Sequence, residues 1–246
     1  MTTNGATAVV FNKVSKSFGP KQVLRDVSFE VRAGEALCIL GRSGTGKSVT
    51  LKLIISLLKP DNGNIWIEED EITSLHASEL SRVRRKMGFL FQDAALFDSL
   101  TLYENLALPL FRLTDKSREE VDFAVDRVLS QVGLAGDKRK MPSELSGGMR
   151  KRAGLARALV LEPRILLADE PSSGLDRITA SEIDELLLKQ KAEHKTALIV
   201  VTHDVRGARR VADRIAVLDR GNLVAEGTVA DIELSENEVA RNLLME

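Results

Sequence analysis

The segment from Gly41 to Ser48 holds the residues whose types and spacing point most directly to chemistry. It matches the pattern G-x-x-x-x-G-K-S/T, in which glycines let backbone N–H groups turn inward around phosphate oxygens. Lys47 could reach the β- and γ-phosphates of a nucleotide, and the hydroxyl of Ser48 could coordinate Mg²⁺. The alternative, a glycine-rich turn with a surface lysine, is disfavoured because the loop follows an apolar run and opens a helical pattern. The expected nucleotide-binding residues here are Gly41, Arg42, Ser43, Gly44, Thr45, Gly46, Lys47, Ser48 and Val49.

Two acidic residues, Asp169 and Glu170, follow the apolar run Ile165–Ala168. Ligands of an open α/β sheet bind beyond the carboxyl ends of its strands. Asp169 could hold Mg²⁺ directly or through water, and Glu170 could orient an attacking water as general base, because a carboxylate on a metal is a poor base. Alone, the pair would be interpreted as exposed loop acids. The phosphate loop favours the catalytic interpretation.

A second glycine motif, Leu145–Met149, opens another expected helix. The Ser146 hydroxyl and the N–H groups of Gly147 and Gly148 would lie at the positive end of that helix and could bind an anion. An ordinary serine N-cap followed by flexible glycines is the alternative, and the spacing alone does not decide between the two. The basic run after the motif, Arg150–Arg152, is interpreted as a solvated helix face.

The elements that must position these residues alternate between strands and helices. Apolar or alternating runs predict strands at Val27–Val31, Ala36–Leu40, Ile65–Ile67, Met87–Phe91, Ile165–Ala168, Ala197–Val201 and Ile215–Leu218. Helices are expected at Val49–Leu58, from Ser117 to Gly133, and at Gly147–Leu161, Arg177–Lys191 and Asp204–Asp213. Such alternation predicts a mostly parallel sheet with a helical block, residues 93–162, inserted into it.

Composition excludes several classes of protein. Of the 246 residues, 43% are hydrophobic and 29% charged, which indicates a folded globular chain. The net charge of −1 argues against a chain whose bulk charge holds nucleic acid, and a single cysteine, Cys38, rules out an intramolecular disulfide. No apolar run is long enough to span a membrane, and Met1–Ala8 shows no signal peptide, so a reducing, cytoplasmic setting is expected.

The order of these motifs resembles the nucleotide-binding subunit of an ABC transporter over about Val9–Gly227. The phosphate loop is similar to that family's Walker A motif, Ile165–Glu170 to its Walker B motif, and Leu145–Gly148 to its signature motif. The resemblance implies an ATPase that uses ATP and Mg²⁺. It also implies the α/β fold of a P-loop (RecA-like) NTPase, with a mostly parallel sheet, an N-terminal antiparallel β subdomain and an inserted helical subdomain. Residues 1–246 would form one domain, with the core in residues 1–92 and 163–246 and the helical signature subdomain in residues 93–162.

The same resemblance implies a homodimer whose subunits meet head to tail. Ser146, Gly147 and Gly148 of one subunit would then face the γ-phosphate held by the Walker A motif of the other. Asp176, in the segment similar to the family's D-loop, would lie on the dimer seam, and it could also be the N-cap of the helix from Arg177.

Further single residues gain expected roles only through the resemblance. Gln92 would be the Q-loop glutamine beside Mg²⁺, giving Ser48, Gln92 and Asp169 as the metal site. His203 would be the switch histidine at the γ-phosphate, and the expected catalytic residues are Lys47, Glu170 and His203. Phe18 would stack on adenine, and a core phenylalanine is the alternative.

Two details narrow the resemblance within the family. Met149 ends the signature where Gln is commoner, and the phosphate loop continues Val-Thr-Leu-Lys. Both look like the ATPases of Mla/Mce-type systems, which implies phospholipid transport across the bacterial envelope with an MlaE-like permease and an MCE-domain protein, at the cytoplasmic face of the inner membrane. Transport of another solute is the alternative, and a non-transport ABC ATPase is less favoured.

Two smaller expectations complete the sequence prediction. Phe97, Leu102 and Tyr103, just after Gln92, are candidates for the surface that docks on the permease. A C-terminal extension that wraps the partner subunit is not expected, because the sequence ends at Glu246, soon after a short predicted helix from Glu236.

Overall fold

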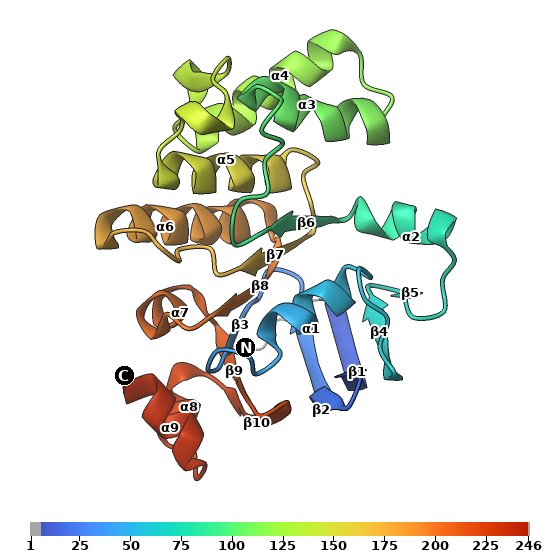
Figure 1. Cartoon of the computed structure of the whole chain (residues 1–246), viewed down its shortest axis with the longest axis vertical. Helices are drawn as coiled ribbons and strands as arrows, with labels where there is room; N and C mark the ends of the chain where they lie inside the picture. Colours follow the sequence, from blue (N-terminus) through green and yellow to red (C-terminus); the bar gives the residue numbers. More distant parts are fainter. Residues whose placement is uncertain (1–5, 246) are drawn as a thin grey trace.

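A six-stranded sheet runs through the centre of the molecule in the computed structural model, which describes residues 6–245 (Figure 1). Its strand order is β10-β9-β3-β8-β7-β6, and all neighbours pair in parallel except β10 with β9. The strands are β3 (Ala36–Leu40), β6 (Met87–Leu90), β7 (Ile165–Asp169), β8 (Ala197–Thr202), β9 (Arg214–Asp219) and β10 (Asn222–Gly227). The predicted α/β class with a mostly parallel sheet is confirmed.

A second sheet, antiparallel throughout, packs beside the first in the order β2-β1-β4-β5. Its strands are β1 (Thr7–Phe18), β2 (Lys21–Arg32), β4 (Asn62–Ile67) and β5 (Asp70–Glu71). Phe11 and Phe29 stack with their ring centroids 4.9 Å apart, and both belong to a buried cluster that also takes in Ile39 of β3 and Ile199 of β8. One apolar core therefore joins the two sheets. The N-terminal stretch without a predicted signal peptide reaches outside the described residues, at positions 1–5.

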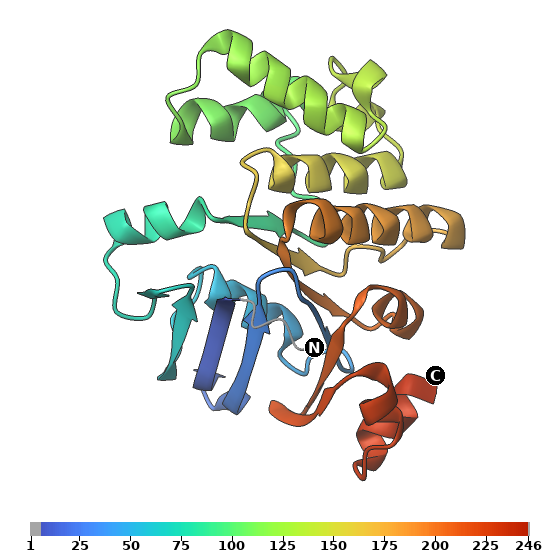
Figure 2. The same ribbon diagram turned by 180° about the vertical axis from the view of Figure 1, so that it is seen from behind.

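Helices gather in three places around the sheets. At one end of the molecule lie α3 (Leu102–Leu113), α4 (Arg118–Gln131) and α5 (Gly147–Leu159) (Figures 1 and 2). The short 3₁₀ turns η1 (Ala135–Asp137) and η2 (Pro142–Glu144) lie between α4 and α5. At the other end lie α8 (Val229–Glu233) and α9 (Glu238–Met245). Between them are α1 (Lys47–Ile54), α2 (Ala77–Arg84), α6 (Arg177–His194) and α7 (Val205–Val211). Within residues 6–245, none of the helices is both long and apolar enough to cross a bilayer.

Local chemistry explains most helix boundaries. Helix α4 begins as its capping box predicts: Ser117 Oγ accepts a hydrogen bond from the N–H of Glu120, and the Glu120 carboxylate accepts one from the N–H of Ser117. The helix predicted at Val49–Leu58 instead runs from Lys47 to Ile54. It ends early because Ser56 adopts a left-handed backbone conformation, which no α-helix continues through. Helix α3 was not predicted, although Thr101 and Glu104 cap it in the same way as α4.

Candidate active site

The phosphate loop connects β3 to α1 and is shaped by two left-handed glycines. Gly44 has φ +79° and Gly46 has φ +109°, values that residues with a Cβ rarely adopt. A Cβ on Gly46 would lie 2.6 Å from Leu24 and 3.0 Å from the carbonyl of Val23, so β2 packs directly against the loop. No side chain caps the start of α1 and no acidic residue lies in its first turn. The helix therefore presents free N–H groups to an anion.

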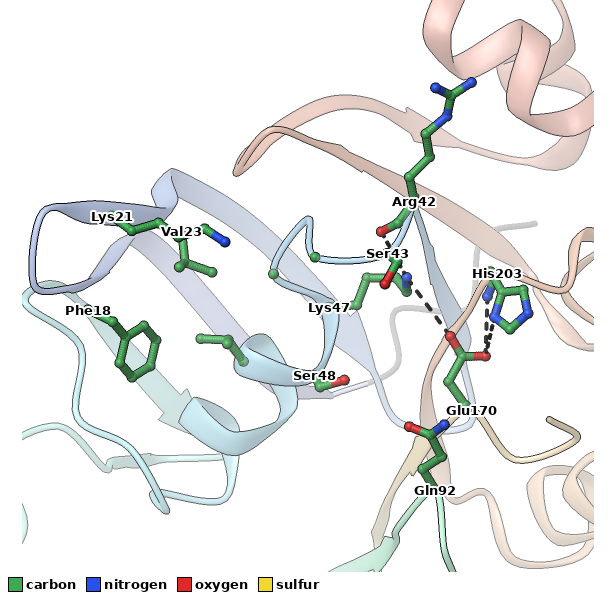
Figure 3. Close-up of a pocket in the computed structure, with 13 residues that line it drawn as sticks. Phe18, Lys21, Val23, Arg42, Ser43, Lys47, Ser48, Gln92, Glu170 and His203 are labelled. Carbon is green, nitrogen blue, oxygen red and sulfur yellow. Dashed lines mark hydrogen bonds and ion pairs between the residues drawn. The ribbon is translucent and has the colours of Figure 1, made fainter. Parts of the chain in front are cut away.

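Lys47 lies inside this loop rather than on the surface. Its Nζ donates hydrogen bonds to the carbonyls of Gly41 (2.7 Å) and Arg42 (3.2 Å) and lies 3.9 Å from Glu170 Oε1 (Figure 3). Burial lowers the pKa of the Lys47 ammonium, and Glu170 and Asp169 oppose that shift. The alternative of a surface lysine is therefore wrong, and the cation is available to an anion in the loop.

Ser48 and Asp169 meet at the carboxyl end of β7. The Ser48 hydroxyl donates to Asp169 Oδ1 at 2.9 Å, although 121 positions separate the two residues. Burial raises the pKa of Asp169, and the Ser48 hydrogen bond opposes the shift. A nearby cation stabilises the charged form of a buried carboxylate. Mg²⁺ favours sites in which one or two protein oxygens are completed by substrate phosphates. The described part of the chain holds no cluster of three or more His, Cys, Asp or Glu able to bind a metal.

Glu170 is held at the end of β7 by the neighbouring strand β8. Its Oε2 accepts a hydrogen bond from Thr202 Oγ1 (3.0 Å) and one from the N–H of His203 (3.3 Å), and it lies 2.9 Å from His203 Nδ1. The other oxygen, Oε1, faces Lys47. The backbone of Glu170 has φ +47°, a disfavoured conformation for a residue other than glycine. The carboxylate therefore has one oxygen fixed by donors and one directed at the loop.

A cavity of about 650 Å³ brings these residues together. The phosphate loop, Glu170, Gln92 and the exposed imidazole of His203 line it, and Phe18, Lys21 and Val23 lie at its far side (Figure 3). Phe18 is 46% exposed, so the core-phenylalanine alternative is wrong. Its ring also lies 5.6 Å from the Nζ of Lys16.

The second glycine motif lies outside this cavity. Ser146 is the N-cap of α5 and its Oγ accepts from the N–H of Met149 at 3.2 Å, while Asp176 caps α6 through the N–H groups of Ile178 (3.0 Å) and Thr179 (3.1 Å). Both capping alternatives are therefore realised. Gly148 packs closely enough on Thr179 that a Cβ would lie 2.5 Å from its methyl carbon. The two segments are thus neighbours, and Ser146 and Asp176 are exposed to solvent.

A family model described as ABC transporter matches residues 24–173, which contain both glycine motifs and the Asp169–Glu170 pair. The chain belongs to the ABC transporter family. Cassettes of this family hydrolyse ATP with Mg²⁺ and work as dimers with a membrane permease, so this chain is an ATP-hydrolysing subunit of an ABC transporter.

Named relatives cover almost the whole cassette. The chain is 45% identical over 237 residues to "Probable ribonucleotide transport ATP-binding protein mkl" of Mycobacterium leprae. The matched region covers 96% of this chain and 68% of that protein. It is 41% identical over 228 residues to "Methionine import ATP-binding protein MetN 1" of Bacillus cereus, covering 91% of this chain and 66% of the relative. The chain thus spans about two thirds of the length of these relatives.

Solved ABC cassettes share the fold. A bacterial ABC transporter cassette described as dimeric superposes with a TM-score of 0.85 at 34% identity, covering 90% of this chain and 98% of that one. A structure of a dimeric post-hydrolysis state with ADP and Pi gives a TM-score of 0.84 at 35% identity, with the same coverage of each chain. The expected P-loop ATPase fold is confirmed.

Sequence reasoning missed one residue that contacts the candidate active site. The run Arg150–Arg152 was interpreted as a solvated face, and this is wrong for Lys151, which is 7% exposed and donates to the carbonyl of Glu170 at 2.9 Å. The available signal was helical spacing: Lys151 lies three residues before Gly154 and seven before Ala158, on the face that packs against β6.

Asp184 of α6 is a second buried group that the sequence did not single out. It is 7% exposed and lines a neighbouring cavity of about 660 Å³ that also reaches Glu170 and His203. Burial raises its pKa to about 6; Asp204 adds to the shift and Arg210 opposes it. Folding therefore favours the protonated form, so the free energy of unfolding falls as the pH rises from about 4 through 6 and stays lowered above that.

Replacing Asp184 with asparagine is expected to raise the free energy of unfolding at pH 7.5 by up to about 3 kcal/mol, because the neutral amide removes the buried charge. Urea denaturation at several pH values measures this, and the gain should shrink as the pH is lowered toward 4. Glu193→Gln, on an exposed part of the same helix, is the matched control and should change stability by less than about 0.5 kcal/mol. A gain that is equal at every pH would contradict the raised pKa.

Proposed function

We propose that Glu170 is the general base for ATP hydrolysis in this subunit. The observation that carries the proposal is its placement beside the Ser48–Asp169 hydrogen bond, with one carboxylate oxygen fixed by Thr202 and His203 and the other turned to the phosphate loop. A base must be oriented to accept a proton from a positioned water, and two strand ends provide that orientation here. His203 contributes by fixing the carboxylate and by lining the cavity.

The remaining cavity residues receive binding roles. The loop N–H groups and Lys47 hold the phosphates, while Phe18, exposed at the edge of the cavity, offers its face to adenine. Ser48, Asp169 and Gln92 are the proposed Mg²⁺ ligands. When bound, the metal neutralises phosphate charge and aligns the β- and γ-phosphates.

The proposed active unit is a homodimer in which each ATP is shared. Ser146, Gly147 and Gly148 are outside the cavity of their own chain, yet they lie at a helix start with no acidic residue in its first turn. Such a terminus binds an anion presented by another molecule. The solved cassettes described as dimeric, to which the chain is similar, support a dimer. In the proposed pairing, which follows the family resemblance, the signature motif of one copy covers the phosphate loop of the other.

The proposed permease-docking surface is a cavity of about 440 Å³ between α3, α4 and the end of α5. Of the docking candidates predicted from sequence, Phe97 is exposed, whereas Leu102 is fully buried in the core and the Tyr103 hydroxyl donates to Asp122. Leu102 is therefore wrong as a docking residue, because it packs inward as the first residue of α3. Phe123, 71% exposed, lines the cavity, and the exposed Phe111 lies on the adjacent α3. A helix or loop of the permease would cover this apolar surface.

Replacing Phe123 with aspartate is expected to reduce co-purification with the permease by about 10-fold or more, because a charge replaces a large apolar contact. The ATPase activity of the isolated subunit should not change. Leu234→Asp, at a residue that is also highly exposed but lies next to α8 at the far end of the molecule, is the control that should keep the permease. Full recovery of the permease with Phe123→Asp would exclude this surface.

The proposed cargo is a solute other than lipid. The relatives' names refer to ribonucleotide transport and methionine import, which fits the alternative from sequence better than phospholipid transport with an MlaE-like permease and an MCE-domain protein. Met149 and the phosphate-loop sequence are what still favour the lipid candidate. Reconstitution of the whole transporter in vesicles decides: stimulation of ATP hydrolysis by a ribonucleotide or by methionine supports the first cargo class, and ATP-driven phospholipid transfer alone supports the second. In either case the chain would be held at the membrane through its permease.

A further inference from the structure

The buried amine of Lys151 connects the signature helix to the catalytic loop of the same chain. Its Nζ donates to the carbonyl of Glu170 (2.9 Å) and to Ser173 Oγ (3.3 Å), and the Ser173 hydroxyl donates to that same carbonyl (3.0 Å). Lys151 lies in the second turn of α5, the helix that Ser146 begins. The helix that begins after Ser146, a proposed nucleotide contact, is therefore hydrogen-bonded to Glu170, the proposed general base.

The backbone of Glu170 needs external support. Its left-handed conformation, φ +47°, is disfavoured for a side chain with a Cβ and persists only where the surroundings fix it. On one side, the N–H of Glu170 donates to the carbonyl of Val201 in β8 at 2.9 Å. On the other side, its carbonyl receives the bonds from Lys151 and Ser173. Because the charged donor makes the stronger type of bond, Lys151 supplies much of the support on that side.

The same face of α5 also holds the segment after Gln92. A Cβ on Gly154 would lie 2.8 Å from the Cβ of Ala94, and the Arg157 guanidinium donates to the carbonyls of Ala94 and Ala95. Lys151, Gly154 and Arg157 are spaced three residues apart and therefore lie along one side of the helix. One rigid helix consequently contacts both the loop of Gln92 and the loop of Glu170.

We propose that Lys151 is a positioning residue for ATP hydrolysis, which holds the backbone of Glu170 and of Ser173 so that the carboxylate points into the cavity. The proposal rests on the proposed function, because it requires Glu170 to be the general base. Lys151 touches neither phosphate loop nor cavity, so it acts through Glu170 and not on the nucleotide. Its amine also ties the position of Glu170 to that of the signature helix.

Lys151→Met tests the proposal because methionine keeps the length and the apolar stem of lysine and removes the donor. The purified subunit, or the whole transporter where the permease is in hand, is assayed for kcat, for KM of MgATP and for affinity for a fluorescent ATP analogue. We expect kcat to fall by about 10–100-fold, the range of one or two charge-assisted hydrogen bonds, with KM and affinity within about 3-fold. Lys151→Arg, which restores a charged donor, should recover most of kcat. Lys189→Met, an exposed lysine of α6, is the control.

A double variant separates this proposal from the proposed function. If Lys151 acts through Glu170, Lys151→Met combined with Glu170→Gln should hydrolyse ATP no more slowly than Glu170→Gln alone. Near-normal hydrolysis by Glu170→Gln alone would instead remove the general base itself. Unchanged kcat in Lys151→Met, or a loss confined to KM, would overturn the positioning role.

A further variant keeps the proposal testable if Lys151→Met does not fold. Ser173→Ala removes the neighbouring donor to the Glu170 carbonyl with little loss of packing, and it should lower kcat by about 3-fold with KM unchanged. In that case, a loss of kcat in Ser173→Ala together with near-wild-type kcat in Lys151→Arg would support the proposal. Wild-type kcat in Ser173→Ala, or a folded Lys151→Arg that has lost most of its kcat, would overturn it.

Discussion

Replacing Glu170 with glutamine is expected to lower kcat for MgATP hydrolysis by about 10²–10⁴-fold while nucleotide still binds. Glutamine has the shape of glutamate, and its amide oxygen can accept the bonds that Thr202 Oγ1 and the N–H of His203 now give to the carboxylate. It cannot accept a proton from water at neutral pH. The phosphate loop, Lys47 and the Ser48–Asp169 pair are left in place, so affinity for MgATP should stay within a few-fold.

Steady-state hydrolysis and equilibrium binding measure the two halves of this expectation. Size-exclusion chromatography with MgATP adds a third readout, because a subunit that binds ATP but does not hydrolyse it should accumulate as a dimer. Glu193→Gln, an exposed glutamate of α6, should behave as wild type in all three assays. Hydrolysis by Glu170→Gln within a few-fold of wild type would show that another group takes the proton.

Five of the six strands of the central sheet were predictable, because each is a run of adjacent apolar residues, whereas the half-buried β10 and the N-terminal β1 were not predicted. Ala36–Leu40 is continuously apolar and is fully buried as β3, and Ser117 and Glu120 mark the start of α4 by a reciprocal pair of hydrogen bonds. Predictions failed where a side chain is buried by a hydrogen-bond partner far along the chain, or where that partner has an unusual backbone conformation. Lys151 looked solvated because its acceptors, Glu170 and Ser173, follow 19 and 22 positions later.

Leu102 shows a different cause of error. An apolar residue beside Gln92 suggested a docking surface, but the capping box of Thr101 starts a helix there and turns the Leu102 side chain into the core. The capping signal, Thr101 followed by Glu104, was present in the sequence. Phe111 of α3 and Phe123 of α4 are exposed and replace Leu102 as docking candidates.

The residue types of the candidate site were predictable from the sequence, whereas the hydrogen bonds that orient their side chains were less so. The phosphate loop and Glu170 each follow an apolar strand in the sequence, so their place in one cavity follows from the motifs, whereas Gln92 was expected there only through the family resemblance. The donors that orient Glu170, namely Thr202 Oγ1 and the N–H of His203, depend on the pairing of β7 with β8 and could not be derived from spacing. The proposed role of Ser146 depends on a second copy of the chain, whose position cannot be derived from one sequence.

Replacing Ser146 with aspartate should abolish hydrolysis, by about 10²-fold or more, without weakening ATP binding to a single subunit. Aspartate caps a helix as well as serine does, and its charge suits the N-terminus of α5, so the isolated subunit should keep its stability. In the proposed dimer, however, that carboxylate would face the γ-phosphate bound by the other copy, and like charges would repel. The phosphate loop of the variant itself is unchanged, because Ser146 lies outside the cavity of its own chain.

The test places Ser146→Asp in the Glu170→Gln background and measures ATP-dependent dimers by size-exclusion chromatography. Dimers should be lost while the ATP affinity of the monomer is retained, whereas Lys47→Ala should lose the affinity itself, because it removes the cation from the loop. Ser143→Asp, an exposed serine in η2 only three residues earlier, is the matched control and should still form ATP dimers. Normal hydrolysis by Ser146→Asp would mean that the signature motif of one copy does not meet the nucleotide of another, and the shared site would have to be abandoned.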